Sequence, residues 1–429
     1  MKERVIRVDA LCRVEGEGAL RVRLKGEQVE TVELRLFEPP RFFEAFLRGK
    51  SLLEAPDIVA RICGICPVAY QMSSVHALEK LCGVRVPEGV RELRRLFYCG
   101  EWIESHALHV FMLHAPDFLG YADGLEMARD HRALVERGLR LKKTGNAIVA
   151  LLGGREIHPV SARVGGFYRA PARDALRGLI PSLEWAREAA AETLRWSAAL
   201  DFPDFEPDYE LVSLRHPDEY PMNEGRIVSS RGLDCEAEDF NRRFEERQVP
   251  HSTALQALRR GGGTYLLGPL ARFNLNFDRL PAAIREACRS LGVAPPLANP
   301  FKSIAARAAE LWLACEEALR LARSYREPAR AFAEVPPRAG EGHAATEAPR
   351  GLLYHRYRTD AGGLLTDVQI VPPTSQNQAR IEADLRELLP GLLRLPDEEL
   401  QARCERAIRN YDPCISCAAH FLRLSVERA

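Results

Sequence analysis

The sequence has little lysine, no excess of charge of either sign and no long apolar run. Only seven of its sixty basic residues are Lys. The sixty basic residues are matched by sixty acidic ones, so net charge gives no reason to expect nucleic acid or an anionic membrane as a partner. The amino terminus has neither the apolar stretch nor the twin arginine of an export signal. The longest apolar runs, such as residues 147–152, are too short to cross a bilayer. We therefore predict a cytoplasmic protein with no membrane insertion and no nucleic-acid partner.

The cysteines form neither a disulfide framework nor an iron–sulfur ligand run. Their number, eleven, is odd, which fits a reducing compartment. Seven of them form no spaced cluster and are predicted to be small buried apolar residues, namely Cys12, Cys82, Cys99, Cys235, Cys288, Cys315 and Cys404. A Gly-rich nucleotide-binding fingerprint is also missing. The sequence therefore offers neither a ligand set for an iron–sulfur cluster nor a nucleotide-binding loop.

The remaining composition is that of an ordinary soluble protein, with 46% hydrophobic and 28% charged residues. Residues 19–24 and 32–37 alternate apolar and polar positions around a turn at 25–27, which predicts antiparallel strands. Segments 183–200 and 303–325 have helical spacing of apolar residues. Residues 261–263 and 335–345 are rich in Gly or Pro and are predicted to be loops or short linkers. We predict one large, mainly α (α+β) domain over residues 1–429, with a β-rich segment at about 1–40 and a long-helix core.

Two Cys-x-x-Cys pairs lie near opposite ends of the chain, Cys63 with Cys66 and Cys414 with Cys417. Four thiolates brought together make a soft, electron-rich metal site. A structural zinc is the simplest alternative, because it needs only four closed ligands. Zinc ribbons usually separate their pairs by about 15–20 residues, however, and here 347 residues intervene. A thioredoxin-like redox disulfide is a further alternative, but its βαβ context is missing.

The surroundings of the pairs are Arg61-Ile62-Cys63-Gly64-Ile65-Cys66-Pro67 and Asp412-Pro413-Cys414-Ile415-Ser416-Cys417-Ala418-Ala419-His420. They closely resemble the two metal-binding signatures of nickel–iron hydrogenase large subunits. Other blocks, in the family's order, resemble further elements of it: Arg13-Val14-Glu15-Gly16, Pro40-Arg41-Phe42-Phe43-Glu44, Gly153-Gly154-Arg155-Glu156-Ile157-His158-Pro159 with Gly165-Gly166, Ala348-Pro349-Arg350-Gly351, and Pro373-Thr374-Ser375-Gln376-Asn377. The resemblance spans nearly the whole chain and implies that family's large-subunit fold.

The resemblance implies that all four Cys bind nickel and that Cys66 and Cys417 also bridge to an iron carrying carbon monoxide and cyanide. Dihydrogen would be split there, with Cys414 as the proton acceptor. Glu15 matches the family's proton-relay carboxylate, and a carboxylate is a suitable general base. A salt-bridged surface carboxylate is the alternative for Glu15. The family's His two residues later is Glu17 here, which leaves the hydrogen bonding around the relay open.

The resemblance assigns further roles around the metals. Arg350 would contact a cyanide and orient dihydrogen, and Thr374 would bond the other cyanide. Asp117 and Asp412 resemble the carboxylates grouped around Arg350, and a buried Arg needs such partners. The resemblance also implies a magnesium site with Glu44 and His420 as ligands. Magnesium favours oxygen donors, so without the family His420 would be read as a fifth ligand of the thiolate site or as a residue that supports its ligands.

Tyr70 replaces the His found in many membrane-linked relatives, and together with the absence of an export signal this favours the cytoplasmic NAD(P)-linked, multi-subunit class, some of whose members also reduce sulfur. The partners implied are an iron–sulfur small subunit, a further iron–sulfur subunit, and a diaphorase subunit that binds flavin and NAD(P). Two alternatives remain: relatives coupled to a deazaflavin or a heterodisulfide reductase acceptor, and a non-catalytic, zinc-bearing subunit of a redox complex. The tail at 421–429 predicts trimming after His420 by a maturation endopeptidase, or a variant that matures uncut.

Overall fold

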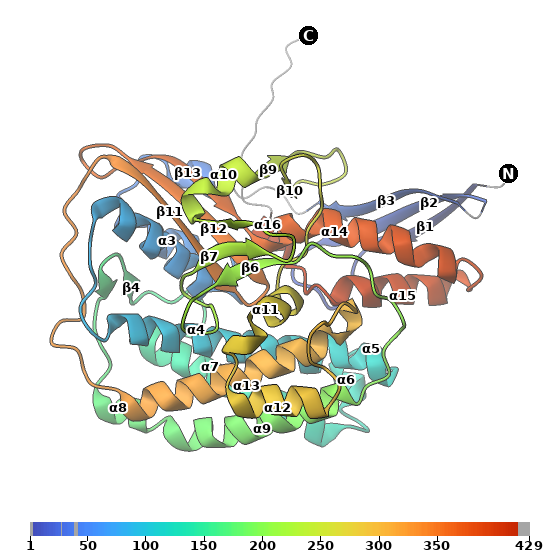
Figure 1. The fold of residues 1–429 in the computed structure, drawn as a ribbon, viewed down its shortest axis with the longest axis horizontal. Coiled ribbons are helices and arrows are strands. Elements are labelled where there is room, and N and C mark those ends of the chain that lie inside the picture. Colours follow the sequence, from blue (N-terminus) through green and yellow to red (C-terminus); the bar gives the residue numbers. More distant parts are fainter. Residues whose placement is uncertain (1–2, 27, 38–41, 419–429) are drawn as a thin grey trace, which may run out of the picture.

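The computed structural model describes residues 3–26, 28–37 and 42–418. Four long helices form the lower layer in Figure 1: α4 (Val90–Ala107), α7 (Arg132–Gly153), α9 (Ile180–Ala198) and α13 (Ser303–Ser324). Helix α4 contacts α7 and α13, and α13 contacts α9. The helices predicted at 183–200 and 303–325 are confirmed as α9 and α13. None of the helices in the described ranges is both long and apolar enough to span a bilayer.

Helices α4 and α7 cross at two glycines. A Cβ atom on Gly145 would lie 2.5 Å from the carbonyl oxygen of Gly100, and one on Gly100 would lie 3.0 Å from Ile148. Glycine inside a helix costs about 1 kcal/mol relative to alanine, so its presence at both positions reflects how closely the two backbones approach. This close crossing sets the position of α4 against α7. Helix α4 carries several buried charged residues in the interior of the molecule.

The smaller helices connect and cover this layer. Helix α4 continues into a π-helical segment (Leu108–His114) and then α5 (Ala115–Leu119). Helices α3 (Pro67–Cys82), α14 (Pro373–Leu388) and α15 (Asp397–Arg409) lie above the long helices. The other short α-helices are α1 (Phe43–Leu47), α2 (Ala55–Val59), α6 (Gly124–Met127), α8 (Arg173–Arg177), α10 (Phe240–Arg243), α11 (Pro269–Asn276), α12 (Ala282–Ser290) and α16 (Ile415–Ala418).

The amino-terminal sheet is antiparallel in the order β1 (Glu3–Val8), β2 (Gly18–Lys25), β3 (Gln28–Leu36). In β2 every second residue is buried, from Gly18 to Leu24, as the alternating sequence pattern predicts. The predicted hairpin is confirmed as β2 and β3, and Gly26 takes a left-handed φ of 65° in the turn. Strand β1 was not anticipated. The mainly α fold with a small amino-terminal sheet is confirmed.

A second antiparallel sheet, β11 (Gly340–Ala348), β12 (Gly351–Thr359) and β13 (Leu365–Val371), corrects one prediction. The segment 335–345 was predicted to be a loop, but β11 begins at Gly340. Gly342 serves close packing, because a Cβ there would collide with the carbonyl oxygen of Ala77 in α3, whereas a Cβ on Gly340 would make an ordinary contact with Leu81 at 3.5 Å. Gly in a strand marks such close approaches as well as turns.

Three small antiparallel sheets complete the described fold. They pair β6 (Val212–Arg215), β7 (Arg226–Ser229) and β8 (Asp234–Cys235); β9 (Phe244–Arg247) and β10 (Gln256–Arg259); and β4 (Ala162–Arg163) and β5 (Gly166–Phe167). The predicted loop at 261–263 follows β10.

Candidate metal centre

The first Cys pair lies in the connection between α2 and α3. Cys66 is the residue before α3, and Pro67 occupies the first turn, where its missing N–H costs nothing. The free N–H groups of Val68 and Ala69 donate to the buried carboxylate of Glu101 on α4, at 2.6 and 3.1 Å. Helix starts need such acceptors. Glu101 therefore ties the Cys66 end of α3 to the long-helix layer.

The second Cys pair lies around α16, between α15 and the end of the described chain. Its contacts come from remote segments. Glu15 forms a parallel β-bridge with Cys414, and its carbonyl oxygen accepts from the N–H of Ile415 at 2.9 Å. The Glu15 carboxylate accepts from the N–H of Ser416 at 3.1 Å. The Thr374 hydroxyl, at the start of α14, accepts from the N–H of Cys414 at 2.9 Å.

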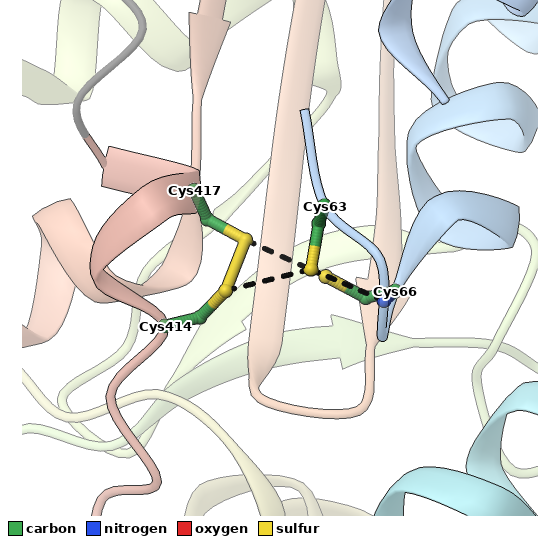
Figure 2. Close-up of side chains that lie close together, drawn as sticks. All are labelled: Cys63, Cys66, Cys414 and Cys417. Atoms are coloured by element: carbon green, nitrogen blue, oxygen red, sulfur yellow. Dashed lines mark hydrogen bonds between the residues drawn. A yellow bond between two sulfur atoms is a disulfide. The ribbon is translucent and has the colours of Figure 1, made fainter. Parts of the chain in front are cut away.

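The two pairs meet in the interior, as Figure 2 shows. All four sulfurs lie within 4.8 Å of one another and all four residues are buried. The sulfurs of Cys63 and Cys414 are 3.5 Å apart, as are those of Cys66 and Cys417. Four sulfurs about 2.3 Å from a central ion would be separated by about 3.8 Å, so the set can close around a single metal.

In the structure Cys414 and Cys417 are joined as a disulfide (Figure 2). The predicted four-thiolate site requires this bond to be reduced, because only the thiolate binds a metal. Elsewhere in the described ranges no comparable convergence of His, Cys, Asp or Glu side chains occurs. The chemistry of the donor set fits a soft, redox-flexible metal such as nickel, and by geometry alone it also fits zinc.

The first pair is electrostatically prepared to carry a negative charge. Burial disfavours a thiolate at Cys63, but a hydrogen bond from the Cys66 side chain and the positive charge of Arg350 lower its pKa below the usual value. The N–H groups of Ile65 and Cys66 also point at the Cys63 sulfur, both at 3.3 Å. The bond to Cys63 and burial raise the pKa of Cys66. Of the two sulfurs, that of Cys63 is therefore the one better suited to carry the negative charge.

Arg350 lies at the turn between β11 and β12 and is 3% exposed. Its Nε donates to the carbonyl oxygen of Asp412 at 2.8 Å, and its Nη2 donates to Asp412 Oδ1 at 3.1 Å. Its Nη1 is buried and has no acceptor among the described residues. Burial lowers the pKa of Arg350, but the negative charge of Asp412 raises it. The thiolates of Cys63 and Cys66 and the Glu15 carboxylate raise it further, to above its usual value. The predicted pairing of Arg350 with Asp412 is confirmed, and one arm of the guanidinium stays free near the sulfurs.

Asp117 does not pair with Arg350 in the described structure, which corrects the prediction for this residue. Its carboxylate binds Arg409 through two bonds of 2.7 Å and Arg13 at 2.6 Å. These partners lower the pKa of Asp117 despite its burial. Because Arg13 precedes Glu15 and Arg409 ends α15, this ion pair joins the chain segment that carries Glu15 to the segment that leads to the second Cys pair. The described contacts of Asp117 are therefore with these two segments.

Glu15 is half-buried, and its Oε2 lies 3.1 Å from the Cys414 sulfur. Among the described residues the Glu15 side chain contacts Cys414 and Ser416 and forms no salt bridge, which does not favour the alternative of a salt-bridged surface carboxylate. Glu44, in α1, accepts from the N–H of Ile370 at 2.7 Å, and burial raises its pKa to about 8. The other predicted magnesium ligand, His420, lies outside the described residues.

Backbone strain concentrates in the blocks singled out from the sequence. Among the described residues, four that are not glycine have a positive φ: Arg13, Phe42, His158 and Asp412. Such conformations cost about 1–3 kcal/mol each and persist where the surroundings impose them, often at functional sites. Arg13 and Asp412 lie two residues before Glu15 and Cys414, so the strain lies beside Glu15 and the second pair.

Sequence reasoning missed two buried acidic residues of α4, Glu101 and Glu104. Burial raises the Glu101 pKa well above 4.5 and the Glu104 pKa to about 7, the latter against the pull of Lys142 3.3 Å away. Their signal in the sequence was a pair of carboxylates spaced i, i+3 within a largely apolar helix.

One further prediction is corrected: Cys12 is exposed, whereas the other six unclustered Cys are buried as expected. Cys12 lies in the bend after β1, where its side chain points outward.

The chain matches the family described as nickel-dependent hydrogenase over residues 41–137 and 266–420. It is 32% identical to the alpha chain of sulfhydrogenase 1 of Pyrococcus furiosus, with 98% of both chains covered. It is 30% identical to a subunit of the vhc F420-non-reducing hydrogenase of Methanococcus voltae, covering 97% of this chain and 94% of the other. Each signature, including all four Cys, falls within these matches.

Among solved structures, the chain resembles an NAD⁺-reducing [NiFe]-hydrogenase in the H₂-reduced state, with a TM-score of 0.84 and 27% identity over 97% of this chain and 99% of the other. It also has the fold of the [NiFeSe]-hydrogenase of Desulfomicrobium baculatum, with a TM-score of 0.80 and 22% identity over 98% of this chain and 100% of the other. Of the metals that fit four thiolates, the match to the nickel-dependent hydrogenase family favours nickel over a structural zinc.

Proposed function

Because this chain belongs to the nickel-dependent hydrogenase family, we propose that it is the catalytic large subunit that oxidises dihydrogen reversibly to protons and electrons. Cys63, Cys66, Cys414 and Cys417 would hold nickel, and Cys66 and Cys417 would share their sulfurs with an iron bearing carbon monoxide and cyanide. When bound, this centre supplies the site of dihydrogen cleavage. The observation that carries the proposal is the convergence of four buried sulfurs beside the Glu15 carboxylate.

The residues around the sulfurs provide the proton path. A proton on the Cys414 sulfur is within hydrogen-bond reach of Glu15 Oε2, at 3.1 Å, which is the geometry a general base needs. The same oxygen accepts from the N–H of Ser416, so the carboxylate keeps its orientation whether or not it carries the proton. Glu15 is half-buried and can pass the proton outward.

The residues around Arg350 provide orientation. Asp412 fixes two of its nitrogens, and Nη1 has no acceptor within the described ranges. A charged donor in a dry site acts strongly on nearby polar ligands, so Nη1 would bind a cyanide and hold dihydrogen over the metals. Thr374 would bind the second cyanide, as well as the N–H of Cys414. Glu44 and His420 would hold magnesium, an ion that takes carboxylate oxygens and completes its shell with water.

Electrons must leave through a partner, because the described residues hold no second metal-binding cluster. The surface beside the first Cys pair suits such a partner: Ile157 and Val160 are 57% and 42% exposed, and Ile157 lies 3.8 Å from a Cβ placed on Gly64. We assign this surface to an iron–sulfur small subunit. The sulfhydrogenase alpha chains and the NAD⁺-reducing structure support NAD(P) as acceptor, reached in the cytoplasm through two further partners, an iron–sulfur protein and a flavin-bearing diaphorase.

The test is purification of the native complex under anaerobic conditions. We expect one nickel per large subunit, infrared bands of metal-bound carbon monoxide and cyanide, and reduction of NAD⁺ or NADP⁺ by dihydrogen. Zinc without nickel would refute the catalytic proposal and favour a structural role. If the complex oxidised dihydrogen with an artificial dye but reduced neither NAD⁺ nor NADP⁺, only the proposed electron acceptor would be refuted. The intact mass of the large subunit would decide whether residues 421–429 are removed.

A further inference from the structure

A fully buried guanidinium, Arg272 on α11, lies behind the turn that carries Arg350. All five of its N–H groups have acceptors. Nε and Nη2 bind the two oxygens of Glu310 at 2.8 and 2.7 Å, and Nη1 binds Glu347 at 2.9 Å. The remaining two N–H groups bind the carbonyl oxygens of Ala348 and Pro349, at 2.6 and 2.7 Å. Arg272 thus holds the two residues immediately before Arg350 by their backbone.

The acceptors of Arg272 are themselves fixed. Glu310, on α13, also accepts from the hydroxyl of Tyr220 at 2.7 Å and lies 3.0 Å from His106. Arg272 lowers the Glu310 pKa to about 2 although burial opposes this. The indole of Trp102 lies 4.4 Å from the guanidinium and donates to the carbonyl oxygen of Glu347 at 3.1 Å. The guanidinium is therefore anchored to α4 and α13, two helices of the rigid lower layer.

The backbone on the same side of the turn is packed to contact. A Cβ on Gly268, at the start of α11, would lie 2.8 Å from the carbonyl oxygen of Arg350. A Cβ on Gly351 would lie 2.8 Å from Leu267, and Gly351 has a positive φ of 133°. Glycine is required at both positions by close approach as well as by conformation. The turn is thus pressed against α11 on one side and faces the sulfurs on the other.

We propose that Arg272 is a positioning residue for dihydrogen chemistry, which holds the 348–351 turn so that the free Nη1 of Arg350 faces the metal site. Asp412 restrains the end of the Arg350 side chain, and Arg272 restrains its backbone. A lysine cannot replace this function, because one ammonium cannot reach two carboxylates and two carbonyls arranged around a planar fork. The proposal rests on the catalytic function proposed above, since it assigns Arg272 to the same reaction.

The first measurement needs neither metal nor activity. In the metal-free chain, Arg272→Lys should raise hydrogen–deuterium exchange in peptides spanning 348–351. The control is Arg94→Lys. Arg94 also makes a buried two-bond contact with a carboxylate, that of Glu79, at 2.8 and 2.5 Å, but it does not contact the turn. Unchanged exchange at the turn in Arg272→Lys, or an equal increase in Arg94→Lys, would overturn the proposal.

The second measurement separates positioning from general stability. In nickel-loaded complex, Arg272→Lys should lower kcat for dihydrogen oxidation by at least about tenfold, with KM for dihydrogen within about twofold, because misplacement of a catalytic group by 1 Å can cost about a hundredfold. In an Arg350→Lys background the same change should add less than about twofold, because Arg272 acts through Arg350. If the two substitutions instead lowered kcat by independent factors that multiply, the proposal would be overturned.

A third variant covers failure of Arg272→Lys to fold. Glu310→Gln keeps the bonds from Arg272 to the turn but weakens the anchor of the guanidinium. It should produce the same pattern at smaller size, with a kcat loss of about threefold and a measurable rise in exchange at 348–351. No change in either quantity would overturn the proposal. If the nickel-loaded complex had no hydrogenase activity at all, the proposed function would fail. The exchange data would still show whether Arg272 restrains the 348–351 turn.

Discussion

The two Cys pairs are held by different kinds of structure. Cys63 and Cys66 are placed by helix packing: α3 starts after Cys66, and Glu101 joins that start to α4. Cys414 and Cys417 lie before and within a four-residue helix, which is too short to fix anything by itself. Three remote segments hold them instead, at residues 15, 350 and 374.

This difference separates two functions. A pair set by packed helices gives the metal a fixed position. A pair held by side chains from elsewhere lies in contact with the proposed relay, Glu15, and with the Thr374 hydroxyl, while Arg350 binds Asp412 two residues before it. The residues that hold this pair are thus the ones proposed to act. Changes near the first pair should therefore affect stability, and changes near the second should affect chemistry.

The largest expected effect is on metal retention. Cys417→Ser should abolish nickel binding, because a serine hydroxyl is a hard, protonated ligand that cannot replace a bridging thiolate. Elemental analysis of the purified large subunit measures this. The control is Cys288→Ala, which alters a buried cysteine of α12 and should leave one nickel per chain. One nickel per chain in Cys417→Ser would contradict the assignment.

The next effect is on turnover at full metal content. Glu15→Gln keeps an acceptor for the N–H of Ser416 but cannot take a proton, so kcat should fall by about 10²–10⁴-fold. Dihydrogen oxidation and exchange of dihydrogen with deuterated solvent measure this. Glu17→Gln makes the same change two residues away at an exposed position and should keep activity within about twofold. Equal losses in both variants would argue against a relay at Glu15.

The first pair should respond in stability. Glu101→Ala leaves the N–H groups of Val68 and Ala69 buried without acceptors and opens a cavity, which should cost about 2–4 kcal/mol. The shift in the urea midpoint of the metal-free chain measures it. Glu92→Ala, an exposed change in the same helix, should cost less than about 0.5 kcal/mol. A midpoint unchanged in Glu101→Ala would show that α3 is held without this carboxylate.

A smaller effect is expected at Thr374. Thr374→Val removes the acceptor for the N–H of Cys414 and should cost about 1–2 kcal/mol, seen locally as faster amide exchange at Cys414. Thr193→Val removes a hydroxyl that donates to a carbonyl within α9, at Ala189, and should leave the Cys414 amide unaffected. Similar exchange at Cys414 in both variants would show that the bridge to Glu15 suffices.

The smallest effect is a pH dependence. Burial raises the Glu101 pKa well above its usual 4.5, so the folded chain binds that proton more tightly than the unfolded chain. The favourable contribution is complete below about pH 4.5 and is lost as pH rises toward the folded pKa. Glu101→Gln removes this titration, so its urea midpoint should depend less on pH than that of the parent. If the urea midpoints of Glu101→Gln and the parent changed with pH in parallel, the raised pKa of Glu101 would be contradicted.

The sequence predicted the parts of the site whose signal is local. The Cys pairs, the Glu15 block and the Arg350 turn were each found as short motifs, and the long helices α9 and α13 follow from periodicity. What it did not predict depends on distant partners. Nothing near Asp117 in the sequence indicates that Arg13 and Arg409 would claim its carboxylate. Gly340 and Gly342 were assigned to a loop, because the helix they pack against is remote in sequence.

The buried charges show the same limit. Arg272, Glu310 and Glu347 come from three separate elements, and each alone looks like an ordinary charged residue. Their burial is tolerable only because each satisfies the others, a condition that exists only in the folded chain. A residue of this kind can be recognised in sequence only as a charge within an apolar run.

The bridge between Glu15 and Cys414 joins residues 399 positions apart, which sets an order for biosynthesis. A ribosome delivers the Glu15 segment and the first Cys pair long before the second pair, so the first pair and its helix can fold well before their metal-binding partners exist. During that interval the two thiols of the first pair lie without the second pair. The centre is therefore only half built until residues 414–417 have been synthesised and have joined the Glu15 segment.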